Sequence, residues 1–368
     1  MNKEIISNKS AISLIVLFIF GSSLILPTAT DAGSDLWISI LLAIVFTIPI
    51  FLIYSRILSL YPNKDLFDIL IIVFGKWIGK FLCLLFSWFA FHLGVLVLRN
   101  FGSFIITVSF PETPMIVPMI FLGLLGVWVV KEGIEVLGRW SWIFFIFNAP
   151  APTLVTLLLI PKMDFNNILP LFYNGSKAIL KGTFSAFSFP FGEVVILTMI
   201  FFCLSNRKSS YKVFLSGLFI GGIPLAGISL VEILVLGPDL YKASYFPNHS
   251  VATKIGLGDF LQRLEILVLI AAVTGGFVKI SVCLMACSNG IAKVFNLKDY
   301  RSVIFPMGLL MINFSYLIYD NVMEQIAWAD EIWPYYAFLF QAILPIIVFI
   351  IAEIRKSSKI KSGRNSDE

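Results

Sequence analysis

Charged residues are scarce in this chain. Asp, Glu, Lys and Arg make up 13% of its 368 residues, about half the share that is usual in soluble globular proteins. Hydrophobic residues account for 58%, and apolar runs of about 20 residues, the length that crosses a bilayer, recur along the whole sequence. A soluble domain is thereby excluded, and the sequence predicts an all-α integral membrane protein.

Histidine and cysteine are also rare, which argues against a metal site and against most kinds of enzymatic catalysis. The two histidines, His92 and His249, are too far apart in the sequence to indicate a zinc site. The sequence has no nucleophile with an adjacent base, no metal-ligand cluster and no Gly-Lys phosphate loop. We therefore predict no enzymatic activity, no cofactor, no metal and no nucleic-acid partner. All four cysteines lie inside apolar runs, where they are predicted to pack as small residues: Cys83, Cys203, Cys283 and Cys287.

Ten apolar segments are each long enough to span a membrane, and the loops between them are mostly short. They cover about 10–30, 36–60, 81–109, 114–131, 140–161, 183–204, 212–236, 260–290, 302–319 and 334–354. The sequence thus predicts a single polytopic membrane domain over 1–368, with no separate soluble domain.

The basic residues predict the orientation of the chain. With the N-terminus in the cytoplasm, 19 Lys and Arg residues fall on the inner side and 6 on the outer side. This excess predicts that both termini are cytoplasmic. Residues 355–368 are predicted to form a disordered basic tail near anionic lipid headgroups, with a specific docking tail as the alternative.

Two segments between the spans carry local signals. Residues 61–80 mix charges with an apolar face and predict an interfacial helix or hairpin. Residues 237–259 contain two prolines and two glycines and predict an ordered outer loop with short helical pieces. Glu232, near the outer end of the seventh segment, is predicted to lie at the interface.

The sixth segment contains a helix breaker and a charge near its middle. The stretch "TFSAFSFPFGEVVILTMIFF" at 183–202 carries Ser188, Phe189 and Pro190, then Gly192 and Glu193. Backbone groups without a partner are costly in lipid, so a broken helix survives there only when it is buried in protein or lines a wet cavity. The break is therefore predicted to face the interior of the bundle.

The first segment contains a matching interruption, "FGSSLILPTATDAG", with Gly21, Ser22 and Ser23 followed by Pro27. Breaks in the first and sixth of ten spans predict two inverted repeats of five spans, over about 10–161 and 183–354. The broken helix ends would offer N–H and carbonyl groups to a zwitterion such as an amino acid. An ordinary kink is the alternative for either segment alone.

Three ionisable groups lie within spans, where charges are expensive and usually functional: Arg99, Glu193 and Lys279. Glu193 either senses the ligand or a proton, or pairs with Lys279 or Arg99 to hold the bundle together. Lys279 is a candidate to occupy the place of a sodium ion. His92 either lines the cavity or is a satisfied buried histidine.

Several motifs together resemble one known family. They are "GSSLILP" in the first span, "LRNF" in the third, "GIEVLGR" after the fourth, "FPFGE" in the sixth, and "GDFLQRLEIL" followed by "GGFVKI" in the eighth. Over nearly the whole chain they resemble the B subunit of the GerA-type nutrient receptors of bacterial spores. That family is similar to the amino acid–polyamine–organocation superfamily of transporters, which has the LeuT-like five-plus-five fold with its first and sixth helices discontinuous.

The resemblance implies a function. Such B subunits recognise small germinants, often amino acids, in the spore inner membrane, alongside an A subunit and a lipoprotein C subunit. It implies that Gly21, Ser22 and Ser23, with the stretch from Ser188 to Glu193, line the germinant pocket. Arg263 and Glu265 would form an outer structural motif. Ser23 departs from the superfamily, which commonly has a second glycine there. A proton-coupled amino-acid symporter, with Glu193 as proton carrier, is the alternative.

Overall fold

The described residues fold into a bundle of helices. The structure is a computed structural model that describes residues 5–204, 209–255 and 265–364. Seven helical segments are long and apolar enough to cross a membrane: Thr30–Leu60, Lys76–Val108, Ile134–Lys162, Gly175–Met199, Ser209–Leu236, Ile266–Phe295 and Val322–Ser357. Two shorter apolar helices join them, Asn8–Ser23 and Arg301–Leu317. The predicted all-α membrane class is confirmed, whereas the count of ten spans stays a prediction.

The first half of the chain forms eight α-helices and three short 3₁₀ segments. The α-helices are α1 (Asn8–Ser23), α2 (Leu36–Leu60), α3 (Leu66–Phe74), α4 (Lys76–Val108), α5 (Ile116–Glu132), α6 (Ile134–Asn148), α7 (Pro150–Leu159) and α8 (Gly175–Ala186). The 3₁₀ segments are η1 (Thr30–Asp35), η2 (Ile160–Lys162) and η3 (Phe165–Ile168).

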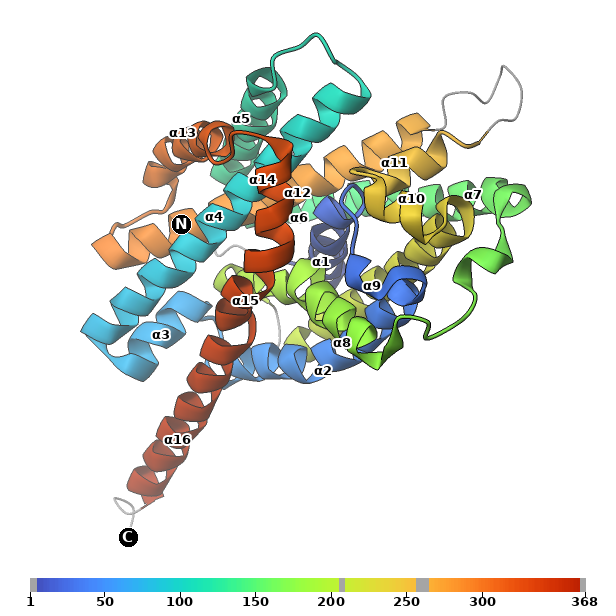
Figure 1. The fold of residues 1–368 in the computed structure, drawn as a ribbon. Coiled ribbons are helices and arrows are strands. Elements are labelled where there is room, and N and C mark those ends of the chain that lie inside the picture. The colour runs from blue at the N-terminus through green and yellow to red at the C-terminus, as the bar shows by residue number, and fades with distance from the viewer. Residues whose placement is uncertain (1–4, 205–208, 256–264, 365–368) are drawn as a thin grey trace.

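The second half continues from α8 through a broken span to a long C-terminal helix. Its elements are η4 (Phe187–Phe191), η5 (Gly192–Met199), η6 (Phe201–Cys203), α9 (Ser209–Leu236), α10 (Pro238–Ala243), α11 (Pro247–Ala252), α12 (Glu265–Phe295), α13 (Arg301–Leu317), α14 (Val322–Ala327), η7 (Trp328–Ile332), α15 (Trp333–Phe338), η8 (Leu339–Ile343) and α16 (Leu344–Arg364). The elements α14 to α16 form one nearly continuous column that extends beyond the bundle (Figure 1).

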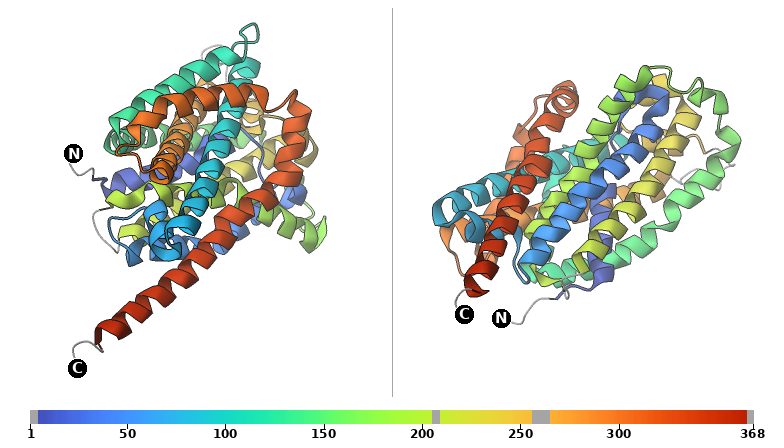
Figure 2. Two further views of the ribbon diagram at one scale, coloured as in Figure 1. Left: turned by 90° about the vertical axis from the view of Figure 1, so that its left-hand side faces the viewer. Right: turned by 90° about the horizontal axis from the view of Figure 1, so that it is seen from below.

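Helix α1 lies at the centre of the bundle, between α12 and α9 (Figure 1). Almost every residue of α1 is buried, from Ala11 to Ser23, whereas α2 and α6 keep many apolar side chains exposed on one face, as a lipid-facing helix does. Helix α12 also packs along α4, and α2 packs along α9. The two described ends of the chain lie on the same side of the bundle (Figure 2).

The first span breaks later than the sequence predicts. Gly21, Ser22 and Ser23 form the last turn of α1 and are still helical, and the non-helical stretch runs over 24–29. The sixth span breaks where predicted, because Phe189 alone leaves helical geometry (φ −145°, ψ 113°) between α8 and η5. Two π-type segments further interrupt the C-terminal column, over 328–332 and 339–343.

The C-terminal tail is helical instead of disordered through Arg364. The start of the tail also contacts the bundle. The Arg355 guanidinium donates to the carbonyl of Ile72 at 3.2 Å, and the Lys356 ammonium donates to the carbonyl of Leu60 at 3.1 Å. These basic side chains cap the ends of α3 and α2, where carbonyl groups lack helical partners.

Candidate functional site

A cavity of about 310 Å³ lies where the first and sixth spans are broken. Small-molecule sites in proteins commonly begin at about this size. Its wall is built from the end of α1 with the break after it, the middle of α4, the sixth span, α10 with the loop after it, and the C-terminal column with the turn before it. Residues of these five parts include Ser22 and Leu26; Leu93, Val97 and Asn100; Ser185, Phe189 and Glu193; Lys242 and Tyr245; and Tyr319, Gln325, Trp328, Asp330 and Trp333.

Four polar atoms of the cavity wall have no hydrogen-bond partner in the described part of the chain. They are Ser22 Oγ, the Tyr245 hydroxyl, Gln325 Oε1 and Trp328 Nε1. Buried polar groups are nearly always paired in folded proteins, and these four supply both donors and acceptors. They can therefore bind a polar ligand, while Phe189, Trp328 and Trp333 give the cavity aromatic walls.

Glu193 and Lys279 form a buried ion pair beside the cavity. The Lys279 Nζ lies 2.5 Å from Glu193 Oε2, and the two side chains are 0% and 1% exposed. The ammonium also lies 5.1 Å from the Phe18 ring centre and 5.2 Å from that of Phe189, within the range of a cation–π attraction. Glu193 lines the cavity, but its charge is already matched by a lysine.

Gly21 positions this lysine because it lets α1 approach α12 closely. A Cβ atom at Gly21 would lie 3.0 Å from Lys279 Cδ and 3.1 Å from the carbonyl oxygen of Gly275. Gly275 has the same role on the other side, since a Cβ there would lie 3.1 Å from the Cα of Gly21. Gly21 thus packs α1 against α12 and does not line the cavity.

Several other predicted pocket residues contact the protein backbone instead of the cavity. Ser23 Oγ donates to the carbonyl of Ile19 at 2.6 Å within its own helix. Ser188 Oγ donates to the carbonyl of Pro334 at 3.3 Å, and Ser188 and Pro190 are buried behind the cavity wall. Of the eight predicted pocket residues, those that line the cavity are Ser22, Phe189 and Glu193.

The break in the sixth span is held by the C-terminal column. The carbonyl of Ser188, which the break frees from the helix, accepts from Gln341 Nε2 at 2.9 Å and from Trp333 Nε1 at 3.4 Å. Gly192 makes room for this contact, because a Cβ there would lie 2.3 Å from Gln341 Oε1. Neither Gln341 nor Trp333 was predicted, although a glutamine inside an apolar run is a detectable signal.

The break in the first span is held in the same manner by the segment after α9. The backbone N–H of Thr28 donates to the Tyr241 hydroxyl at 2.9 Å, and the carbonyl of Leu24 accepts from Asn248 Nδ2 at 3.2 Å. Protein side chains thus bind freed backbone groups at both breaks. The bound groups are not available to a ligand.

Arg99 does not pair with Glu193. Its guanidinium donates to the carbonyls of Tyr316 and Tyr319, at 2.9 and 3.0 Å, so it caps the C-terminal end of α13 and the turn beyond. His92 stacks on Trp88 and lies within an aromatic cluster with Trp328 and Trp333. Arg263 and the side chain of Glu265 lie outside the described residues. The described residues contain no group of His, Cys, Asp and Glu that could hold a metal.

Residues 5–323 match the family described as spore germination protein. The chain belongs to this family. This chain is 32% identical to spore germination protein KB of Bacillus subtilis strain 168, over 98% of both chains. It is 26% identical to spore germination protein A2 of the same strain, over 94% of both chains. It is thus a B-type membrane subunit of a non-enzymatic family.

The fold of this spore germination protein is that of a transporter. Its structure is similar to that of Mhp1, a transporter of the nucleobase-cation-symport-1 family, with a TM-score of 0.66 at 10% identity over 93% of this chain and 77% of Mhp1. The LeuT-like fold predicted from the paired helix breaks is confirmed. The identity is too low to carry the ligand of Mhp1 over to this protein.

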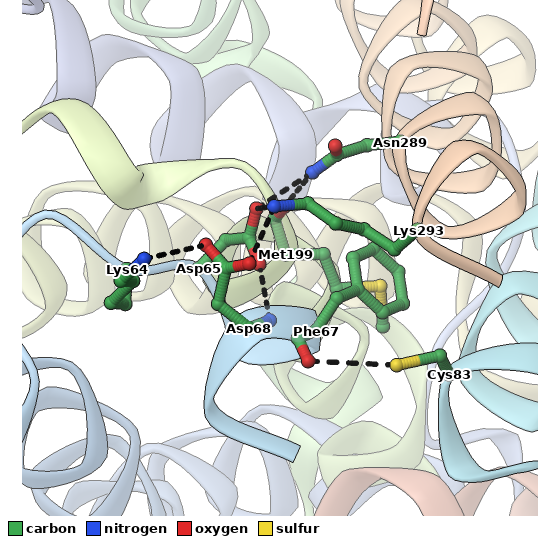
Figure 3. Close-up of polar contacts among 8 residues, drawn as sticks. All are labelled: Lys64, Asp65, Phe67, Asp68, Cys83, Met199, Asn289 and Lys293. Carbon is green, nitrogen blue, oxygen red and sulfur yellow. Dashed lines mark hydrogen bonds and ion pairs between the residues drawn. The ribbon is translucent and has the colours of Figure 1, made fainter. Parts of the chain in front are cut away.

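A polar cluster joins three parts of the spore germination protein: the start of α3, the end of η5, and α12 (Figure 3). Asp65 caps α3 by accepting from the N–H of Asp68 at 2.8 Å. Asn289 of α12 donates to Asp65 Oδ2 at 2.9 Å and to the carbonyl of Met199 at 3.0 Å. Lys293 Nζ lies 2.5 Å from Asp68 Oδ1 and 3.9 Å from Asp65 Oδ2. We call these four side chains the α3–α12 cluster.

The α3–α12 cluster contains two carboxyl groups, of Asp65 and Asp68, and one ammonium group, of Lys293. Burial raises the pKa of Asp65 above that of an ordinary aspartate, and the ammonium of Lys293 opposes this shift. The cluster holds α3 against α12 and against the end of η5, the last part of the broken sixth span. It therefore connects the sixth span to the rest of the bundle at the end remote from Lys242 and Asp330.

Proposed function

We propose that this protein is the membrane subunit of a spore nutrient receptor, and that it binds a small germinant, an amino acid, in the 310 Å³ cavity. The observation that carries this proposal is the coincidence of the cavity with both helix breaks and with four polar atoms that have no partner among the described residues. Few buried polar atoms in a native protein lack a partner, and a ligand or ordered water is a common reason.

The charges at the rim favour an amino acid over a neutral sugar. Lys242 and Asp330 are exposed side chains that line the same cavity. A zwitterion can place its carboxylate near the first and its ammonium near the second. Glu193 is unsuited to bind the ligand ammonium while Lys279 occupies it at 2.5 Å.

Binding would be transmitted to partner subunits by a shift between two packings of the broken spans. The proposed partners are an A subunit and a lipoprotein C subunit in the spore inner membrane. In this proposal the chain crosses the membrane ten times: with the seven long apolar segments, the two shorter apolar helices and α5. Both termini are then cytoplasmic, which the excess of basic residues on the inner side favours.

A proton-coupled amino-acid symporter is the second candidate. The similarity to Mhp1, a transporter described as a cation symporter, favours it. In either case, Lys279 supplies a fixed positive charge between α1, α12 and the sixth span. We propose that this charge stands where a transported cation would sit in a symporter, which favours a receptor. Uptake of labelled amino acid into vesicles that contain the protein separates the two candidates.

The ligand site is tested by a matched pair of serine variants. Ser22 and Ser23 are neighbours in α1, but only the Ser22 hydroxyl faces the cavity without a partner. Amino acids, sugars and nucleosides are screened by thermal shift of the purified protein. Ser22→Ala should weaken binding of the active compound by about fivefold, the value of one hydrogen bond of roughly 1 kcal/mol. Ser23→Ala should leave the affinity unchanged. Equal affinities in the wild type and Ser22→Ala would contradict the site.

A further inference from the structure

Glu232 lies in a second, smaller cavity, although it was predicted to be interfacial. The cavity has a volume of about 30 Å³ and lies between the end of α1, α7, α9, α11 and α12. Only 4% of Glu232 is exposed, so the carboxyl points into the protein. Its neighbours form a separate hydrophobic cluster that includes Val155, Leu159, Val231, Val251 and Val268. Hydropathy gives the depth of a residue along a helix but not the direction in which its side chain points.

The Glu232 carboxyl has no counter-charge among the described residues, where no hydrogen bond or ion pair to it is found. In this it differs from Glu193, which has Lys279 at 2.5 Å. An ionised carboxylate without a partner in an apolar environment is so unfavourable that the group is neutralised instead. The carboxyl of Glu232 therefore needs a positive charge that the described protein does not supply.

The walls of the small cavity favour a proton over a metal ion. Among the described residues that line it, the polar side chains are those of Thr156, Asn248 and Glu232, and the others are apolar. A hard metal cation takes six or more oxygen ligands, which this lining does not provide. The volume of about 30 Å³ is sufficient for one water molecule, which needs about 10–15 Å³. A protonated carboxyl with a bound water satisfies the site.

The cavity is connected to the break in the first span. Leu24, the first residue of the break, lines the small cavity, and its carbonyl is held by Asn248, which lines it as well. Ser22, two positions earlier, lines the large cavity. We propose that Glu232 is a proton-binding site, and that its protonation is coupled to the packing of the broken first span and thereby to occupancy of the ligand cavity. The coupling to the ligand rests on the proposed function.

Two other titratable side chains lie around the site, those of Tyr241 and His249. On α10, the Tyr241 hydroxyl is engaged by the backbone N–H and carbonyl of Thr28, at 2.9 and 3.2 Å. On α11, His249 follows Asn248, and its ring lies 6.3 Å from that of Phe104. The lining residues of α1, α7 and the described part of α12 carry no ionisable side chain. We therefore assign the proposed pH dependence of the first-span break to the buried carboxyl of Glu232.

The first test detects the proton on the purified full-length protein by infrared spectroscopy. A protonated carboxylic acid has a carbonyl stretch that is distinct from the bands of a carboxylate. At neutral pH the wild type minus Glu232→Gln difference spectrum should contain this band. The control is Glu132→Gln, an exposed glutamate at the end of α5, whose difference spectrum should contain carboxylate bands. A carboxylate signal from Glu232 would overturn the proposal.

Thermal stability gives an independent result. Raising the pH from about 6 to about 9 should destabilise the wild type more than Glu232→Gln, because only the wild type must ionise this buried carboxyl. Glutamine mimics the neutral acid in shape, so failure of Glu232→Gln to fold would also count against a protonated carboxyl. Stabilisation by sodium or potassium ions that disappears in Glu232→Gln would assign the site to a metal ion instead.

The coupling is tested with the amino acid that the thermal-shift screen identifies. The wild-type affinity should change with pH, by up to about tenfold per pH unit for one linked proton, and the affinity of Glu232→Gln should not. A pH-independent wild-type affinity would overturn the coupling. If the screen finds no ligand, the proposed function fails while the infrared band still decides whether Glu232 holds a proton.

Discussion

At the scale of single residues, the ionisable side chains buried in the bundle have three different kinds of surroundings. Glu193 pairs with Lys279, Arg99 binds backbone carbonyls, and Glu232 has no partner in the described chain. The sequence identified the first three as residues that need a partner inside the membrane. It left the pairing open, because Glu193 and Lys279 are 86 positions apart and hydropathy contains no information on which helices touch.

Removing one partner of the Glu193–Lys279 pair should be strongly destabilising. Glu193→Gln or Lys279→Met leaves one buried charge unmatched, and the loss of unfolding free energy should be about 3–5 kcal/mol. The double variant should lose less than the sum of the single losses, because no charge remains unpaired. The measurement is thermal or denaturant unfolding of the purified proteins. Strictly additive losses would show that the two groups do not stabilise each other.

At the scale of helices, the breaks could be predicted but their partners could not. Ser188, Pro190 and Gly192 place a break in the sixth span because these residues disfavour a regular helix. The contact that satisfies the freed carbonyl of Ser188 comes from Gln341 and Trp333, about 150 positions later. The first break was placed one turn too early, since α1 remains helical through Ser23. Gly21 permits close helix packing, which the sequence pattern does not distinguish from a break.

Gly192→Leu should disrupt the contact between the sixth span and the C-terminal column. A Cβ at this position would lie 2.3 Å from Gln341 Oε1, so the glutamine must leave the Ser188 carbonyl. We expect a loss of about 1–3 kcal/mol of stability and loss of the nutrient response. Gly227→Leu is the matched control, because Gly227 of α9 faces open space. A normal germination response in Gly192→Leu, measured in spores with wild-type protein levels, would contradict this role.

At the scale of the whole molecule, the two ends of the bundle differ. The ligand cavity extends to exposed Lys242 and Asp330 at one end, and the α3–α12 cluster joins α3, η5 and α12 at the other (Figure 3). The sequence predicted the membrane class, most span positions and the LeuT-like fold from hydropathy and paired breaks. It did not predict the cluster, because Asp65 and Lys293 meet only through the packing of distant helices.

Lys293→Met should make the stability of the protein depend more strongly on pH. Without the ammonium the pKa of buried Asp65 rises further above its unfolded value of about 4. A raised pKa means that the folded state binds the proton more tightly, so stability is lost as the pH rises through the folded-state pKa. We expect a loss of about 1–3 kcal/mol near neutral pH and a smaller one under acidic conditions. The measurement is thermal unfolding as a function of pH.

The control is Lys64→Met, which removes an exposed ammonium 4.0 Å from Asp68. Exposed pairs of this kind contribute little to stability, so this variant should follow the wild-type pH profile. Identical profiles for Lys293→Met and Lys64→Met would show that Lys293 does not balance Asp65.

The C-terminal column has the geometry of a lever arm. From Gln341, which holds the sixth-span break, to Arg364 the chain is helical, a length of roughly 35 Å at about 1.5 Å per residue. A tilt of about 10° at Gln341 would displace the far end by roughly 6 Å at that rise. Three side-chain contacts tie this arm to the bundle: the exposed Arg56–Glu353 ion pair, worth at most about 1 kcal/mol, and the hydrogen bonds of Arg355 and Lys356 to the carbonyls of Ile72 and Leu60. A rearrangement of one glutamine at the sixth-span break would thus become a movement of several ångströms at the end of the chain.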